Sequence, residues 1–458
     1  MGAVRKLLVL IAVLFVFVGH KINNLLQPRP PPKLEETWWG DGDPWRQDTS
    51  IRPFKINVSE QVLKDLKYRL SHARPFTPPL EGIQQQYGMN TNLLKEIVDF
   101  WTTKYNWRER EKLFNQYPQY LTSIQGLDIH YIHVKPKGTN LKVVPLLMLH
   151  GWPGSVREFF DVIPLLTTPQ TDKNFVFEVI VAAIPGYGFS QPAVRPGLSP
   201  AHAAMIFKNL MKRLGFDRFY IQGGDFGAII LQNLAVLYPE VVLGFHSNMC
   251  TVYTPLSYLK TMVGAVWPTL FTKAEHVERV YPLWESFVHR LRETGYLHLQ
   301  ATKPDTLGVA LNDSPVGLAA YILEKFTTGT NISHQSREDG GLKQYYDYAD
   351  LLDNVMLYWI TGSMPTAVRL YSETFNKNFM SLGTGRMPVQ VPSACARFRN
   401  DFYTSDGLLK EIFPNLLHLS DHEGGHFAAF QVPDVFSRDV FVAIEKFENF
   451  NSNLGAKA

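Results

Sequence analysis

One glycine-rich turn carries a side chain suited to nucleophilic chemistry. Residues 223–227 have the sequence Gly-Gly-Asp-Phe-Gly. They join an aromatic and β-branched run at 219–221 to apolar residues at helical spacing at 228–236. A strand that passes into a helix so abruptly forces the central residue into strained dihedral angles, which flanking glycines accommodate. The pattern has the form of a nucleophile elbow with Asp225 in the nucleophile's place. Gly-Gly-Asp also occurs in ordinary loops, and an Asp before a helix is often a plain N-cap, so this pattern alone leaves both interpretations open.

A second loop could supply backbone N–H groups to such a nucleophile. Residues 150–155 have the sequence His-Gly-Trp-Pro-Gly-Ser and follow a near-continuous apolar run at 143–150. An oxyanion hole at this kind of elbow uses one N–H from the loop after an earlier strand and one from the residue after the nucleophile. These two N–H groups would be those of Trp152 and Phe226. The alternative interpretation is a plain Pro-Gly turn.

The candidate general base lies near the C-terminus. Residues 421–430 have the sequence Asp-His-Glu-Gly-Gly-His-Phe-Ala-Ala-Phe, between a predicted strand at 415–420 and a predicted helix at 435–447. Two glycines precede His426 and an apolar turn follows it, so its imidazole would be held at the tip of a loop. These neighbours favour His426 over His422.

An acid is needed to orient that histidine. In chains with this elbow the order along the sequence is nucleophile, acid, histidine, so the acid should lie between Asp225 and His426. It is expected after a predicted strand at 389–398, which makes Asp401 the best candidate and Asp406 the second. An Asp in such an Arg-Asn-Asp loop is otherwise most often only solvated.

The elements that would position these side chains alternate between strands and helices. Strands are predicted at 127–134, 143–150, 175–184, 219–221 and 241–246, and helices at 156–166, 200–214 and 228–236. This alternation predicts an α/β fold with a doubly wound, mostly parallel sheet. We expect the core to comprise residues 141–250 and 372–458. The segment 251–371 is helical and aromatic, which predicts a lid over the carboxyl ends of the strands, where ligands bind.

The N-terminal part of the chain has three predicted segments. A membrane signal anchor is expected over residues 1–22, because an apolar run at 7–18 follows two basic residues and no small-x-small cleavage site comes after it. A cleaved signal peptide is the alternative. Residues 23–49 are expected to form a proline-rich linker and an irregular segment. Residues 50–140 are expected to be an extension that wraps the core, with helices at 59–70 and 91–107 and Ser59 as an N-cap.

Composition narrows the class of protein. The 458 residues are 45% hydrophobic, which supports a large core, and the formal net charge of +3 gives no indication of nucleic-acid binding. The two cysteines, Cys250 and Cys395, provide neither a disulfide framework nor zinc-ligand spacing. One bridge between them is possible, and two free buried thiols are the favoured interpretation.

Taken together, the motifs resemble those of the microsomal-type epoxide hydrolases, from about residue 38 to the end of the chain. The shared pieces are Trp-Trp-Gly at 38–40, Ser-Ile-Arg-Pro-Phe at 50–54, the segment 150–155, Ile-Pro-Gly-Tyr-Gly-Phe-Ser at 184–190, Gly-Gly-Asp at 223–225, Thr-Lys-Pro-Asp-Thr at 302–306, Ala-Leu-Asn-Asp-Ser-Pro at 310–315 and Gly-His-Phe at 425–427. The segment 245–250, Phe-His-Ser-Asn-Met-Cys, is similar to the insect branch, the juvenile hormone epoxide hydrolases.

The resemblance implies an α/β-hydrolase fold and a set of roles. Asp225 would form an ester with the substrate, and Tyr296 and Tyr371 would donate a proton to the epoxide oxygen. His426 would activate water. The product would be a vicinal diol, and neither a metal nor a cofactor is expected. The family also implies a lipophilic epoxide substrate, such as juvenile hormone or a xenobiotic, and an endoplasmic reticulum (microsomal) membrane location through the N-terminal anchor.

Two departures from the family pattern and several alternatives remain. Phe226 replaces a common tryptophan, and Asp401 is one methylene shorter than the usual Glu. The segment from Asp401 to His426 is also slightly shorter than usual, which keeps Asp406 open as the acid. A haloalkane dehalogenase shares the fold and an Asp nucleophile, but Phe226 offers no side-chain donor to a halide. A non-catalytic hydrolase-like binding protein would usually lack the nucleophile or the histidine, and a serine esterase is excluded at position 225.

Overall fold

The computed structural model describes residues 30–44 and 47–455. The chain divides into two compact units, residues 1–33 and residues 34–458, and every element discussed below belongs to the second. The expected signal anchor at 1–22 lies outside the described residues. Among the helices within 30–44 and 47–455, none is long and apolar enough to cross a bilayer.

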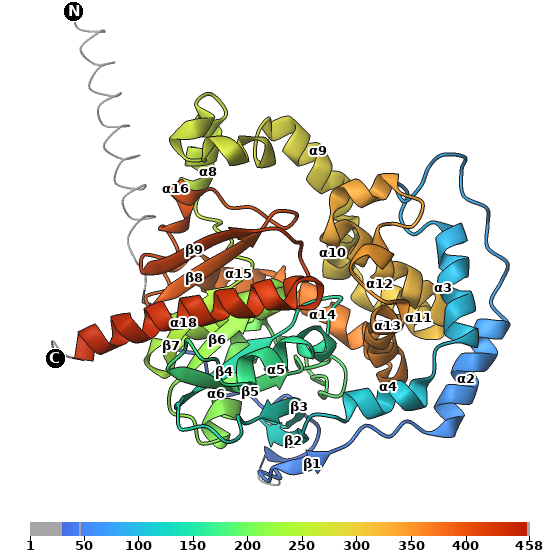
Figure 1. The fold of residues 1–458 in the computed structure, drawn as a ribbon, viewed down its shortest axis with the longest axis horizontal. Coiled ribbons are helices and arrows are strands. Elements are labelled where there is room, and N and C mark those ends of the chain that lie inside the picture. The colour runs from blue at the N-terminus through green and yellow to red at the C-terminus, as the bar shows by residue number, and fades with distance from the viewer. Residues whose placement is uncertain (1–29, 45–46, 456–458) are drawn as a thin grey trace, which may run out of the picture. The chain divides into compact units, whose positions relative to one another are not determined.

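A nine-stranded sheet forms the centre of the second unit (Figure 1). In spatial order its strands are β1 (Arg52–Phe54), β2 (Gln119–Ile124), β3 (Leu127–Val134), β5 (Phe175–Ala182), β4 (Lys142–Leu149), β6 (Phe219–Gly223), β7 (Val242–Ser247), β8 (Ser393–Phe398) and β9 (Leu416–His422). The strands from β5 to β9 run parallel, and β1, β2 and β3 form an antiparallel edge. The predicted mostly parallel α/β sheet is therefore confirmed.

The central strands are largely buried because helices cover the sheet. In β5 and β6 nearly every residue is buried, as expected for parallel strands that lack a solvent-facing side. Two helix pairs pack on the sheet: α5 (Val162–Thr167) contacts α18 (Pro433–Gly455), and α6 (Pro200–Arg213) contacts α7 (Asp225–Leu237). The register places Leu149 of β4 beside Gly223 of β6, so the loops that follow these two strands begin side by side.

A long helical insertion separates β7 from β8 (Figure 1). We call this insertion the lid. Its helices are α8 (Pro255–Gly264), α9 (Leu283–Glu293), α10 (Gly295–Thr302), α11 (Pro304–Asp313), α12 (Pro315–Thr330), α13 (Tyr348–Thr361), α14 (Met364–Thr374) and α15 (Lys377–Leu382). Local signals start several of them, since α8, α11 and α12 each have proline in the first turn. Helices continue past residue 371, the expected end of the lid, as far as Leu382.

The N-terminal extension contributes three helices and the three strands β1, β2 and β3. The helices are α2 (Glu60–Ser71), α3 (Thr91–Thr103) and α4 (Trp107–Phe114). Ser59 caps α2 as predicted. The helix predicted at 91–107 is instead two helices, because the side chain of Asn106 accepts a hydrogen bond from Arg108 N and starts α4. Strands β1 and β2 were not predicted.

The extension is tied to the lid by hydrogen bonds and ion pairs. Arg69 of α2 donates to the carboxylate of Asp313 at 2.8 Å, and the side chain of Gln85 donates to the carbonyl of Glu338 at 2.8 Å. Arg110 of α4 pairs with Asp353 of α13, whose side chain is fully buried. These contacts therefore fix the N-terminal extension against the lid, although the two are far apart in the sequence.

Cys250 and Cys395 form a disulfide, so the prediction of two free thiols is wrong. Cys395 lies on β8 opposite Ser247 of β7, and Cys250 follows the end of β7 by three residues. The pairing of β7 with β8 brings the two Cα atoms to 5.9 Å, within the range that a bridge requires. The bond closes a loop of 145 residues that contains the lid.

We expect removal of this bridge to destabilise the fold. A crosslink over so long a loop restricts the unfolded chain and contributes about 5 kcal/mol to the free energy of unfolding in the chain-entropy description. The double variant Cys250→Ala, Cys395→Ala should therefore lower Tm by about 5 °C in calorimetry. The wild-type protein in reductant is the matched control and should show a similar decrease. Two titratable thiols in the unreduced native protein would contradict the assignment.

Candidate active site

The turn between β6 and α7 has the strained backbone that its sequence suggests. The strand ends at Gly223, the helix begins at Asp225, and Asp225 has φ of +46°. A Cβ at Gly227 would lie 2.1 Å from the carbonyl oxygen of Leu149, and one at Gly223 would lie 2.6 Å from the backbone of Gly227. Neither position can carry a side chain, so the close packing of helix and strands depends on glycine. This packing lifts Asp225 above the carboxyl ends of β4 and β6.

The carboxylate of Asp225 lies between a backbone donor and an imidazole. The Trp152 N–H donates to Oδ1 at 2.9 Å, and Nε2 of His426 lies 3.6 Å from Oδ2. The loop 150–155 presses directly on the turn, because a Cβ at Gly151 would lie 2.3 Å from Cβ of Asp225. Phe226 lies in the first turn of α7, where backbone N–H groups lack an acceptor within the helix.

The lid fixes the loop that carries Trp152. Asn354 of α13 donates to the carbonyl of Pro153 at 2.7 Å, and Tyr358 of the same helix donates to the carbonyl of Gly154 at 2.7 Å. Ser155 in turn donates to the side-chain oxygen of Asn354 at 2.7 Å. These bonds hold the backbone of residues 153–155, so the position of the Trp152 N–H depends on the lid as well as on β4.

His426 is bonded to Asp401 and not to Asp406. Its Nδ1 lies 2.8 Å from Oδ1 of Asp401, whose side chain is buried. Asp406 pairs instead with Arg397 and with Lys273. The structure thus brings Asp225, His426 and Asp401 together and leaves Asp406 in a separate ion-pair cluster.

His422, the other candidate base, is also engaged elsewhere. Its Nε2 lies 2.6 Å from Asp439 of α18, which His246 and His418 contact as well. These contacts place it in a packed cluster between α18 and strands β7 and β9, apart from Asp225.

The charge state of His426 depends on its two carboxylate neighbours. Burial lowers the pKa of its imidazole, but the negative charge of Asp401 and the hydrogen bond to Asp225 outweigh burial, so the pKa is raised well above its usual value. The imidazole is therefore held as a cation while both carboxylates are ionised.

Tyr296 and Tyr371 enter the site from the lid helices α10 and α14. The ring of Tyr296 stacks on Trp152 with 5.2 Å between centroids, and that of Tyr371 meets Phe226 edge-on at 4.6 Å. The two tyrosine rings lie 6.1 Å apart. Burial, reinforced by the negative charge of Asp225, raises the pKa of both phenols. Both hydroxyls therefore stay protonated and able to donate.

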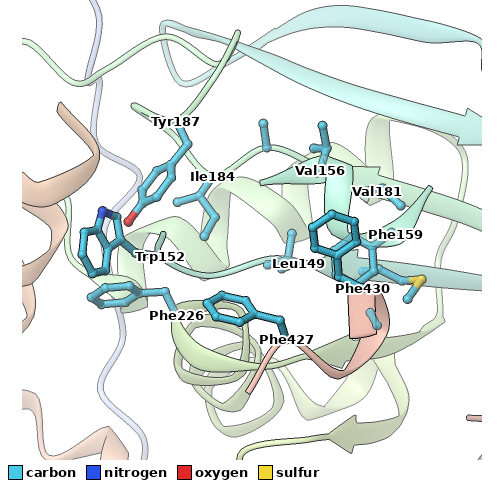
Figure 2. Packing of buried hydrophobic residues seen from close by; sticks show 14 of the residues in the cluster. Leu149, Trp152, Val156, Phe159, Val181, Ile184, Tyr187, Phe226, Phe427 and Phe430 are labelled. Carbon is cyan, nitrogen blue, oxygen red and sulfur yellow. The ribbon is translucent and has the colours of Figure 1, made fainter. Parts of the chain in front are cut away.

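Aromatic side chains enclose this region (Figure 2). Trp152, Tyr187, Phe226 and Phe427 lie near one another, and Leu149 and Ile184 lie beside them. Such surroundings exclude water and strengthen the electrostatic interactions of the few polar groups among them.

Two cavities meet at these residues. A cavity of about 510 Å³ has Trp152, Tyr296, Asp401 and His426 in its wall, and its volume suits a small organic ligand. A second cavity of about 20 Å³ is lined by Asp225, His426 and Glu158 among others, and it shares Trp152, His426 and Phe427 with the first. That volume is enough for one water molecule.

Sequence reasoning missed Glu158. It lies in a short 3-10 helix, η2 (Val156–Phe159), and its carboxylate packs on Gly154, where a Cβ would lie 1.4 Å from Oε1. Burial raises the pKa of its carboxyl to about 8; the charge of His426 opposes this shift and that of Asp225 adds to it. The one available signal was an acid inside an otherwise apolar segment, Val-Arg-Glu-Phe-Phe at 156–160.

Comparison with known proteins gives the family and the fold of this chain. Residues 51–159 match the family described as epoxide hydrolase N terminus, and residues 144–278 match the alpha/beta hydrolase fold family. The chain is 50% identical to juvenile hormone epoxide hydrolase 1 of Ctenocephalides felis, over 99% of this chain and 98% of that protein. It is 44% identical to epoxide hydrolase 1 of Oryctolagus cuniculus, over 89% of this chain and 92% of that protein.

A solved structure extends the likeness to the fold. The crystal structure of juvenile hormone epoxide hydrolase from the silkworm Bombyx mori superposes with a TM-score of 0.90 at 47% identity, covering 91% of this chain and all of that one. Identity of this order over nearly the whole length leaves little room for a different family. The chain belongs to the microsomal-type epoxide hydrolases, in the branch of the juvenile hormone epoxide hydrolases.

Proposed function

We propose that this protein hydrolyses lipophilic epoxides to vicinal diols through an ester between Asp225 and the substrate, and that juvenile hormone is its substrate. The observation that carries the chemistry is the position of the Asp225 carboxylate, which lies between the Trp152 N–H at 2.9 Å and the imidazole of His426 at 3.6 Å. Two protonated tyrosines stand above it. This set matches the needs of a nucleophile, an oxyanion donor, a base and two acids.

In the first step the epoxide ring opens. An oxygen of the Asp225 carboxylate attacks one ring carbon, a carbon–oxygen bond of the ring breaks, and an ester forms. The ring oxygen leaves with the electron pair and takes a proton from Tyr296 or Tyr371. Because burial keeps both phenols protonated in the resting enzyme, each can stabilise the developing alkoxide by hydrogen bonding before the proton moves.

Esterification changes the electrostatics around His426. The neutral ester no longer provides the negative charge that Asp225 contributed, so the pKa of His426 falls and Asp401 alone supports its cationic form. The imidazole then gives its proton to the tyrosinate that the first step leaves, and the neutral imidazole can act as a base. The first step thus prepares the second.

In the second step water cleaves the ester. His426 removes a proton from the water, and the hydroxide attacks the carbonyl carbon of the ester. The oxyanion is stabilised by the Trp152 N–H and, in the family pattern, by that of Phe226. Collapse breaks the bond between the carbonyl carbon and the substrate oxygen, and that oxygen takes the second proton of the water. The products are the diol, the Asp225 carboxylate and a cationic His426, as in the resting enzyme.

The choice of juvenile hormone is supported by the relatives. The flea and silkworm proteins that carry this name are 50% and 47% identical to the chain over at least nine-tenths of its length. A general xenobiotic epoxide is the less favoured substrate. We further propose that residues 1–22 anchor the protein in the membrane of the endoplasmic reticulum, a location supported by the apolar run at 7–18 and suited to substrates that partition into lipid.

Two substitutions separate the two chemical steps. Asp225→Asn should abolish turnover, because an amide is a poor nucleophile. His426→Gln should still form the ester but not cleave it. Intact mass spectrometry of His426→Gln with excess epoxide should therefore show a mass increase equal to one substrate molecule. Normal turnover in either variant, or absence of the adduct in the second, would disprove the mechanism.

The acid limb of the pH profile should report on Asp401. Hydrolysis of the ester needs neutral His426, so its rate should fall as the pH drops through the pKa of that imidazole. Asp401→Asn removes a negative charge that raises this pKa, so the acid limb should move to lower pH, and the maximal rate should fall at least about 10-fold. Single-turnover kinetics would measure both effects.

Asp406→Asn is the matched control for this experiment. It removes the same charge five positions away, in a cluster with Arg397 that does not touch His426, so the acid limb should stay in place. A shift in the control that equals the shift in Asp401→Asn would reverse the assignment of the orienting acid.

A further inference from the structure

Helix α9 faces outward with its apolar side. Trp284, Phe287 and Leu291 recur at helical spacing and are 71%, 49% and 67% exposed, and no residue of the helix is buried. The opposite side carries Glu285 and His289, which line the cavity of about 510 Å³. An amphipathic helix on a globular protein normally turns its apolar stripe to the core. Here the orientation is reversed.

The segment around α8 shows the same reversal. The helix buries Ser257 and Gly264 and exposes Leu259 and Met262 at 60% and 64%. The chain that follows also exposes Trp267 at 65%.

The two segments lie beside each other (Figure 1). Tyr281, just before α9, donates to the carbonyl of Thr261 in α8 at 3.2 Å, and its hydroxyl occupies the place of a Cβ at Gly264. The exposed apolar side chains of both segments are Leu256, Tyr258, Leu259, Met262, Val266, Trp267, Leu270, Trp284, Phe287 and Leu291. We call this set the outer patch. Large exposed apolar patches of this kind mark interaction surfaces.

We propose that the outer patch inserts into the surface of a lipid bilayer. Its charge pattern fits this partner: residues 253–272 contain no acidic side chain and a single basic one, Lys260. On α9 the exposed Arg292 follows Leu291 and can reach lipid phosphates, whereas Arg290 lines the cavity. Trp and Tyr at the rim of an apolar face, with flanking Arg, are typical of helices that lie in the membrane interface.

The outer patch and the large cavity lie on opposite sides of α9. The inner side of α9 is a wall of the large cavity, and the same cavity is lined by Tyr296 and His426. A bilayer in contact with the outer side of α9 would place its hydrocarbon next to the cavity wall. A substrate dissolved in the membrane could then reach the site without crossing bulk water. This part of the inference rests on the proposed function, whereas the docking itself does not.

Local hydrogen exchange tests the docking directly. The full chain is studied with and without phosphatidylcholine vesicles, and amides within 255–293 should exchange several-fold more slowly with vesicles. Exchange within this segment is measured, and not overall vesicle binding, because residues 7–18 are also apolar and could attach any variant to the vesicle. The triple variant Leu259→Asp, Met262→Asp, Leu291→Asp should lose this protection. Its control, Leu80→Asp, Tyr87→Asp, Val309→Asp, changes three equally exposed apolar residues and should keep it.

Kinetics tests the route of the substrate. In the outer-patch variant, KM for an epoxide partitioned into vesicles should rise about 10-fold, while kcat and the turnover of a water-soluble aryl epoxide should stay unchanged. Unchanged protection in this variant would overturn the proposal. So would protection that grows with protein concentration in the absence of vesicles, since that outcome indicates a second copy. If the wild-type protein did not hydrolyse the soluble epoxide, that result would instead refute the proposed function.

A separate observation concerns the cavity of about 20 Å³. It is lined by Asp225, His426 and Glu158, and its volume matches one water molecule. A water there would lie within reach of the base and of the ester carbon that it must attack. No step derived above uses Glu158, although its carboxylate is packed firmly against Gly154.

We infer that Glu158 holds the hydrolytic water. Its carboxyl oxygen accepts one hydrogen of the water, His426 accepts the other, and the water oxygen is left with a lone pair directed at the ester carbon. An acceptor at that point fixes the direction of attack, which lowers the barrier by positioning. The inference depends on the proposed two-step mechanism.

The two half-reactions separate this role from a structural one. Glu158→Gln keeps the shape and an acceptor oxygen, and Glu158→Ala removes the acceptor. In single-turnover measurements Glu158→Ala should form the ester at the wild-type rate and cleave it at least about 10-fold more slowly, with Glu158→Gln closer to wild type. Equal slowing of both steps, or no slowing, would overturn the role. Failure of ester formation in wild-type protein would refute the mechanism itself.

Discussion

The site depends on a steric constraint at the start of α7. Asp225 adopts a left-handed backbone because the chain must pass from β6 into α7 beside the end of β4. The approach is so close that Gly151 and Gly227 cannot carry a Cβ without displacing Asp225 or the backbone of Leu149. The same contact that strains the turn also sets the 2.9 Å bond from the Trp152 N–H. Strain at this position is thus inseparable from pre-organisation of the nucleophile.

A buried ion cluster connects the neighbourhood of the site to the N-terminal extension and to the lid. Asp353 of α13 is fully buried and contacts Arg157 of η2 and Arg110 of α4. Burial raises the pKa of its carboxyl, and the charges and hydrogen bonds of the arginines oppose that shift. Loss of either arginine would leave this carboxylate undercompensated in an apolar environment, which is costly. The cluster therefore joins the N-terminal extension, the lid and the segment after residue 155, which also carries Glu158.

Much of this arrangement can be predicted from local patterns, because it is local in origin. The strand at 127–134 and the N-cap at Ser59 follow from side-chain alternation and from capping chemistry. The elbow pattern follows from glycine spacing. Where two candidates share one loop, local pattern fails: Asp401 contacts His426, whereas Asp406 pairs with Arg397. That choice is made by tertiary contacts.

The remaining features depend on pairing at a distance. The bridge between Cys250 and Cys395 exists because β7 and β8 become neighbours across the whole lid, a relation that no periodicity in the sequence reveals. The apolar spacing in α9 predicts a helix but not which side faces the protein. The acid at Glu158 is unremarkable in sequence and becomes informative only when the fold places it beside Asp225 and His426.

The charge of Asp225 links ester formation to ester hydrolysis in the proposed mechanism. Glu158 and His426 both have raised pKa values, and in each case the charge of Asp225 contributes. In the proposed mechanism, attack on the epoxide converts that carboxylate into a neutral ester. One covalent event therefore lowers both pKa values at once, making the imidazole a better base and the Glu158 carboxyl a better acceptor for water. Hydrolysis restores the charge and returns both groups to the state suited to the next substrate. In this mechanism Asp225 is both the nucleophile and the charge that sets the protonation of His426 and Glu158.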